Sequence, residues 1–408
     1  MVKVLLFILA MSPLFATAKT ITVCSTCTQT SIKGAVNQAV SGDTITIQKG
    51  NYQESEIQIN IPLTLIGQGK PVIDGKGLGI IHVHADSVHI QGLKLINVGT
   101  SYTKDLAAIH YYRSNHFSIQ DNELQNVFFG ILLEKSHKGI VSNNLIQSKS
   151  ADEYNSGNGI HLWHCAQVRI DNNEVTGMRD GIYFEFVSKS QVENNLSKHN
   201  VRYGLHFMFS NENEYSQNTF RDNGAGVAVM FSKQIKMHHN TFAKNWGTAA
   251  YGLLLKEIYD ADITDNIFDE NTIGINAEGS TRINYQHNTF ERNGWAVKIS
   301  GACYNNVFKR NNFIANAFDL SYQGSMNDNV FNHNYWSEYT GYDLDKNGIG
   351  DIPYRPVKLF SYVVNKTPEA IVLLRSLFVD IINFSEKVSP IFTPDDLIDE
   401  HPLMKMVK

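Results

Sequence analysis

The chain has 408 residues, with 35 Lys and Arg against 40 Asp and Glu, so its formal net charge is −5. No basic stretch is concentrated enough to favour nucleic acid as a partner. With 42% hydrophobic residues and 22 Phe, the composition excludes a disordered chain and allows a large core.

The first 18 residues predict an export signal. Lys3 supplies a positive start, residues 4–11 are apolar, and Ala16-Thr17-Ala18 is a small-residue cleavage site. We expect cleavage after Ala18 and a mature chain outside the cytoplasm. No later apolar run reaches the length of a membrane span.

Cys24 and Cys27 form a Cys-x-x-Cys pair directly after this segment. In an oxidising compartment such a pair favours a local disulfide, and metal binding is the alternative.

An internal repeat dominates residues 19–340. An Asn followed two residues later by an apolar or aromatic residue recurs, mostly at intervals of 22 or 23 residues. The series comprises Asn122, Asn144, Asn173, Asn195, Asn218, Asn240, Asn266, Asn288, Asn311 and Asn334. A large apolar residue lies three positions before each Asn. Such a period indicates a solenoid whose turns stack their equivalent side chains.

Each repeat also contains a Gly followed by a strand with alternating polarity, as in Gly204-Leu-His-Phe-Met208. These features predict an all-β fold, a right-handed parallel β-helix over residues 19–340. Residues 29–40 read as a short N-terminal capping helix, and a helical and extended tail follows the solenoid.

The second and fourth residues after each Gly are expected to face outward. This places His161 and Trp163, Tyr183 and Glu185, His206 and Met208, and then Met230 on one outer face. Met208 and Met230 should stack on adjacent rungs, with His206 nearby. Two thioethers and an imidazole suit Cu(I). The alternatives are contact with a partner protein without metal, and plain packing.

Residues 341–358 form an acidic loop. Asp343, Asp345, Asn347, Ile349 through its carbonyl, and Asp351 have the spacing of the start of a Ca²⁺ loop. The twelfth position is Tyr354, so the usual bidentate Glu is missing. A bound Ca²⁺ and a tight turn of Asx residues are both open interpretations.

Residues 359–408 are predicted to be a helical docking tail. Thr367-Pro368-Glu369 is a helix start, and residues 370–384 are strongly apolar. This segment could cap the solenoid or bind a membrane-embedded partner. The terminal Pro402-Leu403-Met404 suggests a docking peptide.

Several segments of the sequence resemble those of the NosD family, the periplasmic maturation factors of nitrous-oxide reductase. They are Gly157-Asn-Gly-Ile-His-Leu-Trp163, Arg179-Asp-Gly-Ile-Tyr183, Arg202-Tyr-Gly-Leu-His-Phe-Met208, Ala225-Gly-Val-Ala-Val-Met230 and Asn334-Tyr-Trp-Ser337. With the 343–351 loop and Pro402-Leu-Met404, the resemblance covers nearly all of residues 40–408.

The resemblance implies a periplasmic, non-catalytic role beside an ABC transporter. The implied partners are the permease and ATPase subunits, a membrane-anchored copper chaperone and nitrous-oxide reductase, with membrane contact only through the permease. It implies that copper is transferred at a surface near these motifs. It also implies that this copper is used to assemble the copper–sulfur centre of the reductase. The assignment of His206, Met208 and Met230 as ligands rests on their expected stacking.

A polysaccharide-binding or -modifying β-helix is the competing class. Such enzymes need acids and bases on the outer face. Here Glu134 and Glu185 occur singly on that face, and no pair of carboxylates with an adjacent base is evident.

Overall fold

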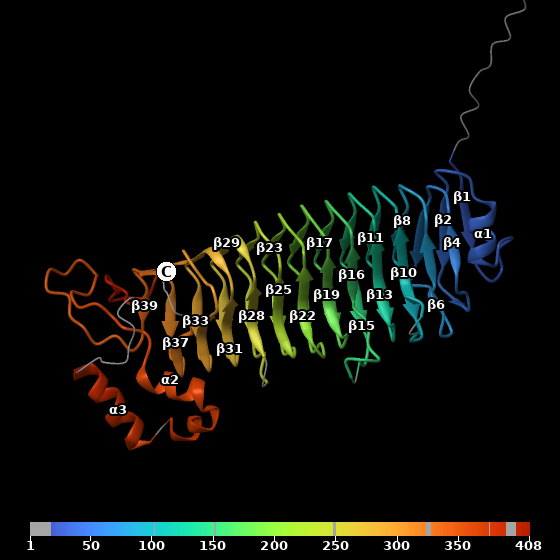
Figure 1. Cartoon of the computed structure of the whole chain (residues 1–408). Coiled ribbons are helices and arrows are strands. Elements are labelled where there is room, and N and C mark those ends of the chain that lie inside the picture. The colour runs from blue at the N-terminus through green and yellow to red at the C-terminus, as the bar shows by residue number, and fades with distance from the viewer. Residues whose placement is uncertain are drawn as a thin grey trace, which may run out of the picture.

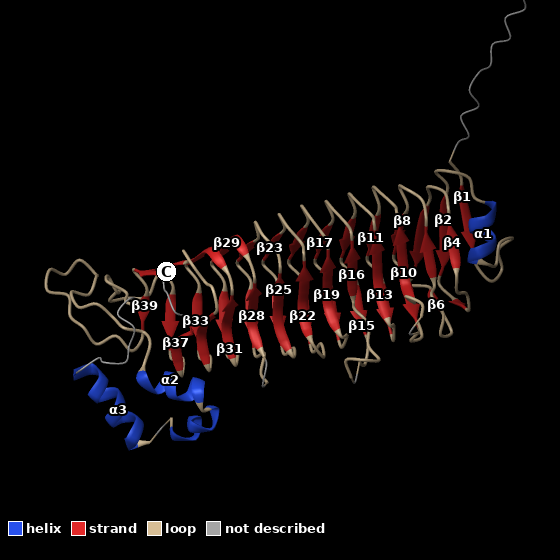
Figure 2. Ribbon diagram, viewed as in Figure 1, coloured by secondary structure: helices blue, strands red, loops and turns tan. Residues whose placement is uncertain are grey.

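The computed structural model describes residues 18–101, 103–150, 152–247, 250–323, 328–374, 376–388 and 397–408. The export signal predicted for residues 1–18 lies outside the described residues except for Ala18. Three long parallel sheets wind into a right-handed β-helix (Figures 1 and 2). The predicted fold class is confirmed.

The sheets have fourteen, twelve and thirteen strands, and every ladder between named strands is parallel. The fourteen-stranded sheet contains β1 (Thr20–Val23), β2 (Thr44–Gln48), β5 (Thr64–Gln68), β8 (His89–Gln91), β11 (Ser118–Gln120), β14 (Ile140–Ser142), β17 (Arg169–Asp171), β20 (Gln191–Glu193), β23 (Glu214–Ser216), β26 (Lys236–His238), β29 (Tyr259–Thr264), β32 (Thr281–Gln286), β35 (Val307–Lys309) and β38 (Val330–Asn332). The twelve-stranded sheet contains β4 (Ile57–Ile59), β7 (Ile81–Val83), β10 (Ala107–Tyr112), β13 (Phe129–Glu134), β16 (Ile160–Trp163), β19 (Asp180–Glu185), β22 (Tyr203–Met208), β25 (Ala225–Met230), β28 (Tyr251–Lys256), β31 (Ile273–Glu278), β34 (Trp295–Ser300) and β37 (Phe318–Gln323). The thirteen-stranded sheet contains β3 (Asn51–Tyr52), β6 (Val72–Asp74), β9 (Lys94–Ile96), β12 (Glu123–Gln125), β15 (Leu145–Gln147), β18 (Glu174–Thr176), β21 (Leu196–Lys198), β24 (Thr219–Arg221), β27 (Thr241–Ala243), β30 (Ile267–Asp269), β33 (Thr289–Glu291), β36 (Asn312–Ile314) and β39 (Tyr335–Trp336).

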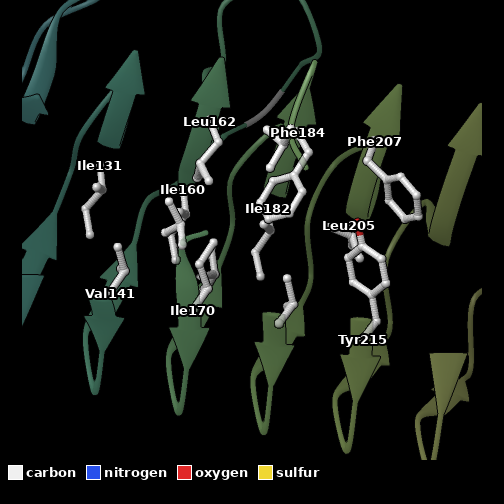
Figure 3. Packing of buried hydrophobic residues seen from close by; sticks show 14 of the residues in the cluster. Ile131, Val141, Ile160, Leu162, Ile170, Ile182, Phe184, Leu205, Phe207 and Tyr215 are labelled. Atoms are coloured by element: carbon white, nitrogen blue, oxygen red, sulfur yellow. The ribbon is translucent and has the colours of Figure 1, made fainter. Parts of the chain in front are cut away.

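Apolar columns fill the interior of the coil. Ile160, Ile182 and Leu205 lie in register on successive rungs and are fully buried (Figure 3). On the thirteen-stranded side Phe268 stacks between Phe242 and Phe290, with ring centroids 4.6 and 4.9 Å apart. Stacked identical rings bury apolar area on each rung of this stack, and this burial stabilises the solenoid.

The repeated Asn residues form a buried hydrogen-bonded ladder. The backbone N–H and Nδ2 of Asn240 both donate to Oδ1 of Asn266, at 2.9 and 3.0 Å. Nδ2 of Asn240 also donates to the Tyr215 carbonyl at 2.9 Å. The ladder thus satisfies backbone groups at a bend, where no sheet pairing reaches them.

A second Asn ladder, which the sequence analysis did not identify, follows another bend. It comprises Asn200, Asn223, Asn245, Asn271, Asn293 and Asn316. Each backbone N–H donates to Oδ1 of the next Asn, and Nδ2 does so as well except at Asn223, whose Nδ2 donates to the Ser197 carbonyl.

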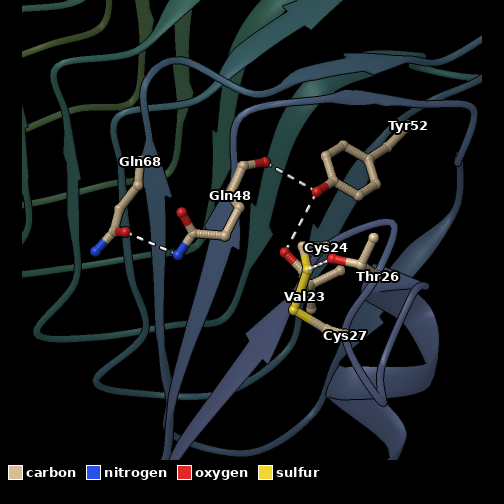
Figure 4. The surroundings of a disulfide bond; sticks show 7 residues. All are labelled: Val23, Cys24, Thr26, Cys27, Gln48, Tyr52 and Gln68. Atoms are coloured by element: carbon tan, nitrogen blue, oxygen red, sulfur yellow. Dashed lines mark hydrogen bonds between the residues drawn. A yellow bond between two sulfur atoms is a disulfide. The ribbon is translucent and has the colours of Figure 1, made fainter.

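The N-terminal end is closed by α1 (Ile32–Gln38). Ser31 caps this helix by accepting from the Gly34 N–H, and its Oγ donates to Glu54. A disulfide joins Cys24 to Cys27 beside it (Figure 4). Near the disulfide, the Tyr52 hydroxyl donates to the Gln48 carbonyl at 2.8 Å (Figure 4).

The C-terminal end is closed by two parts of the tail. The helices α2 (Leu359–Lys366), η1 (Pro368–Leu373) and α3 (Leu377–Val388) pack beside β37. No described helix has the length and apolar character needed to cross a bilayer. The segment from Leu397 onward returns to the last rung.

Residues 402–404, expected to be a docking peptide for a partner, pack on this chain itself. Pro402 is buried, the Leu403 N–H donates to the Asn334 carbonyl at 2.9 Å, and the Met404 N–H donates to the Gly348 carbonyl at 3.0 Å. The physical reason is that the last rung would otherwise leave its backbone groups unpaired.

Asp319 in β37 is buried and occupies the position that is Ala296 one rung earlier and Gly274 two rungs earlier. Burial raises its pKa to about 6, although the Lys358 charge and a hydrogen bond from Asn316 act in the opposite direction. The folded state therefore binds this proton more tightly than the unfolded state, and stability falls as the pH rises through about 6.

We expect lowering the pH from 7.5 to 5 to stabilise the wild type by about 1 kcal/mol more than Asp319→Asn. Hydrogen exchange of β37 and the thermal midpoint, each measured at both pH values, check this. An identical pH response of the two proteins would contradict it.

Candidate functional site

The candidate site lies on the outer face of the twelve-stranded sheet. The predicted alternation of directions holds, but the first outward position of each strand is more covered than the sequence suggested. His206 is only 5% exposed, and its neighbours Ala228 and Leu254 are buried. The insertion at 152–158 lies alongside, because Glu153 pairs with Arg202 and Asn158 contacts His161.

A buried ionic cluster holds the imidazole of His206. Nε and Nη2 of Arg202 donate to the two carboxylate oxygens of Asp180, at 2.9 and 2.6 Å. The Asp180 side chain has no exposed surface. Burial alone would raise the pKa of Asp180, but the hydrogen bonds and the positive charge of Arg202 lower it below its usual value.

The tautomer of His206 decides whether it can bind a metal. Nδ1 lies 3.2 Å from Nη2 of Arg202 and 3.8 Å from Oδ2 of Asp180, and Nε2 is buried without a hydrogen-bond partner. When Nδ1 accepts from Arg202, Nε2 carries the proton and has no free lone pair. A metal at Nε2 therefore requires the other tautomer, with Nδ1–H directed at Asp180.

His161 and Tyr183 continue this face toward the N-terminus. Their ring centroids lie 4.6 Å apart, and Tyr183 lies 5.0 Å from His206. Burial, with the Arg179 charge, lowers the pKa of His161 to about 4. Burial, with the Glu185 charge, raises the pKa of Tyr183 to about 12. Both side chains are therefore neutral at pH 7.

The second outward position is open to solvent. Met208 and Met230 are register partners on β22 and β25, and both are partly exposed. Trp163 and Glu185 precede them in the same column, and Lys256 follows. Register partners on adjacent strands lie about 4.8 Å apart, so the two thioethers share one surface.

An exposed row of stacked rings, not identified from the sequence, follows this column. We call it the aromatic ladder; it consists of His164, Phe186, Phe209 and Phe231. Successive centroids are 4.6, 5.2 and 5.2 Å apart and the planes are within 13° of parallel. An aromatic residue directly after the second outward position in four successive repeats is the signal that could have found it.

Within the described residue ranges, no group of three or more His, Cys, Asp or Glu side chains is arranged to hold a metal ion. That statement covers His, Cys, Asp and Glu side chains and does not cover the thioethers of methionine. In the acidic loop, Asp343 accepts from the Asn347 and Gly348 N–H groups, and Asp351 accepts from the Leu344 N–H. Asp345 and Asn347 make further turns of the same kind. A Ca²⁺ ion here stays a prediction.

A family model described as "Periplasmic copper-binding protein (NosD)" matches residues 36–153 and 145–341. The chain belongs to the NosD family. The matched ranges include the ionic cluster, the two outward methionines and the aromatic ladder. The resemblance drawn from the sequence strings is thereby confirmed.

Two relatives within the NosD family align with most of this chain. A "Probable ABC transporter binding protein NosD" of Pseudomonas aeruginosa is 26% identical over 368 residues, covering 85% of each chain. The protein of the same name from Stutzerimonas stutzeri is 26% identical over 378 residues, covering 88% of this chain and 86% of its own.

Solved structures with similar folds include a tailspike protein and the catalytic unit of a glucanase. The Dettilon tailspike protein superposes with a TM-score of 0.57 at 13% identity, covering 75% of this chain and 68% of its own. An alpha-1,3-glucanase catalytic unit from Streptomyces thermodiastaticus superposes with a TM-score of 0.57 at 14% identity, covering 75% and 65%. At such identities the likeness shows the β-helix fold alone.

Proposed function

We propose that this protein is a periplasmic accessory protein of an ABC transporter that takes part in copper delivery to nitrous-oxide reductase. It contributes to assembly of the copper–sulfur centre and is not itself an enzyme. The observation that carries the proposal is the outward pair Met208 and Met230 on adjacent rungs, within the part of the chain matched by a copper-binding family.

Two thioethers favour Cu(I), because soft sulfur ligands select the cuprous ion. Within the described strands of this sheet, Met208 and Met230 are the two thioethers at the exposed position, and His206 joins them only in the tautomer that turns Nδ1–H toward Asp180. An incomplete ligand set suits a cargo that is passed on. A membrane-anchored copper chaperone is the proposed donor, and the reductase the recipient.

The C-terminal helices are the proposed contact with the permease, whose ATPase partner lies across the membrane. Leu377, Phe378 and Phe384 of α3 are 74%, 57% and 69% exposed, while Val379 on the opposite side of the helix is buried against α2 and β37. A large exposed apolar face of this kind marks a protein or membrane contact. The proposal includes that this protein contacts the membrane only through the permease.

The test is an anaerobic Cu(I) titration against a competing chelator. We expect Met208→Leu/Met230→Leu to weaken Cu(I) binding by at least about tenfold, because Leu keeps the volume but removes both sulfur ligands. Met406→Leu, a substitution of an exposed Met at the far end, is the control. His206→Gln in parallel tests the third ligand. Equal affinity of the wild type and the double variant would refute the proposal.

A second candidate, binding or modification of a polysaccharide, is favoured by one observation. Asp180, Arg202, His206 and Tyr183 form a titratable cluster on the outer face. Against it, Arg202 already occupies the Asp180 carboxylate, and the high pKa of Tyr183 makes that hydroxyl a poor base at neutral pH. Absence of Cu(I) binding, together with binding of an acidic polysaccharide, would favour this candidate.

A further inference from the structure

The aromatic ladder exposes large apolar side chains in one continuous row. Phe186, Phe209 and Phe231 are 42%, 40% and 37% exposed. Three partly exposed Phe rings on adjacent rungs form a patch, whereas scattered exposed apolar residues are ordinary on a protein surface.

The fold does not require aromatic residues at this corner. Lys135 and Glu257 occupy the same position on the rungs that flank the ladder, with φ of 50° and 52°. Phe209 and Phe231 have φ of 49° and 52°, so the left-handed backbone is common to the column. The rings are therefore not explained by backbone geometry or by the core.

The stacking restricts what the ladder can contact. Because each inner ring is nearly parallel to its neighbours, its two faces are covered and its edge points to solvent. Sugars and cations bind to ring faces, so the ladder is poorly suited to them. Thioether sulfur packs well against ring edges.

The ladder is also continuous with the proposed copper surface. Met208 directly precedes Phe209, and Met230 directly precedes Phe231, so each rung presents a thioether and a ring edge side by side. We infer that the aromatic ladder is the docking surface for a methionine-rich apolar segment of the partner that brings Cu(I). This inference rests on the proposed function and names the chemistry of the donor.

The probe is a fluorescent synthetic peptide with two Met-x-x-Met repeats, titrated anaerobically with and without Cu(I). Phe209→Asn/Phe231→Asn removes two rings and keeps the backbone, because Asn tolerates the left-handed conformation. We expect this variant to weaken peptide binding by at least about tenfold. Glu257→Asn, at the same corner one rung on, should change binding by less than about twofold. A norleucine peptide should bind at least about threefold more weakly.

Three results would overturn the inference: full peptide affinity in the Phe variant, equal affinity for the norleucine peptide, or sedimentation showing that the ladder joins two copies of this chain. The chelator titration separates this failure from that of the proposed function. Cu(I) retained by a Phe variant with unchanged peptide affinity would refute the docking surface alone. Peptide binding that depends on the ladder in a protein with no Cu(I) affinity would refute copper transfer alone.

Discussion

Asp399→Ala should destabilise the C-terminal end of the solenoid by about 3 to 5 kcal/mol. The Asp399 carboxylate is fully buried and ends the first Asn ladder. It accepts from the backbone N–H and Nδ2 of Asn334, at 2.9 and 3.0 Å, and from Nε1 of Trp336 at 3.0 Å. The backbone N–H groups of His333 and His401 each donate to it at 3.1 Å. Removing it leaves buried donors without acceptors.

The measurement is native-state hydrogen exchange at the Asn334 and Leu403 amides, with limited proteolysis of residues 341–358. We expect both to accelerate in Asp399→Ala, while exchange in the central rungs stays unchanged, because repeats mainly contact their neighbours. Glu400→Ala changes the exposed neighbouring carboxylate and is the control. Wild-type protection in Asp399→Ala would show that the tail, and not the carboxylate, holds the last rung.

The fold was predictable because equivalent positions of successive repeats stack on one another. A residue type that recurs at a fixed interval in the sequence therefore forms a row of neighbouring side chains in the structure. A single Asn such as Asn240 says little, but its recurrence fixes the rung length, the bend and the inward direction of neighbours such as Met237. The same logic could have found the second Asn ladder. Asn245 and Asn271 each lie five residues after a member of the first series. Their recurrence was not recognised among the many other Asn residues of the chain.

The end of the solenoid was less predictable, because it depends on contacts between segments distant in sequence. Asp399 lies 65 residues from Asn334, and no periodicity links them. The apolar Pro402-Leu403 was therefore predicted to bind a partner. In the structure this segment pairs with the last rung of the solenoid of the same chain.

At the candidate site, the sequence gives side-chain directions correctly but not their coverage. Strand alternation placed His206 and Met208 on the outer face, and both do point outward. Whether an outward side chain is exposed depends on the insertions beside it. It also depends on Arg202 and Asp180, which come before the Gly of their strands and lie outside the alternating positions after it. Such side-chain contacts can be identified only from the three-dimensional structure.

Arg202→Met is the second substitution with a large expected effect. It removes the cation that occupies the buried Asp180 carboxylate and the donor to Nδ1 of His206. A buried ion pair that loses one partner typically costs about 3 to 5 kcal/mol, because the remaining charge stays desolvated. We expect a loss of stability of this size at pH 7, measured by thermal or urea unfolding.

The double variant Asp180→Asn/Arg202→Met separates charge from packing. With the carboxylate neutralised, the buried charge is gone, and we expect most of the lost stability to return. The pH response supplies an independent check. The lowered pKa of Asp180 stabilises the folded wild type above the unfolded carboxyl pKa and is lost as the pH falls. In Arg202→Met the opposite holds, since a desolvated carboxyl without its cation gains stability on protonation. A double variant no more stable than Arg202→Met would mean that Arg202 acts on this face through packing, and that His206 is held by the aromatic rings of Tyr183 and Tyr203 instead.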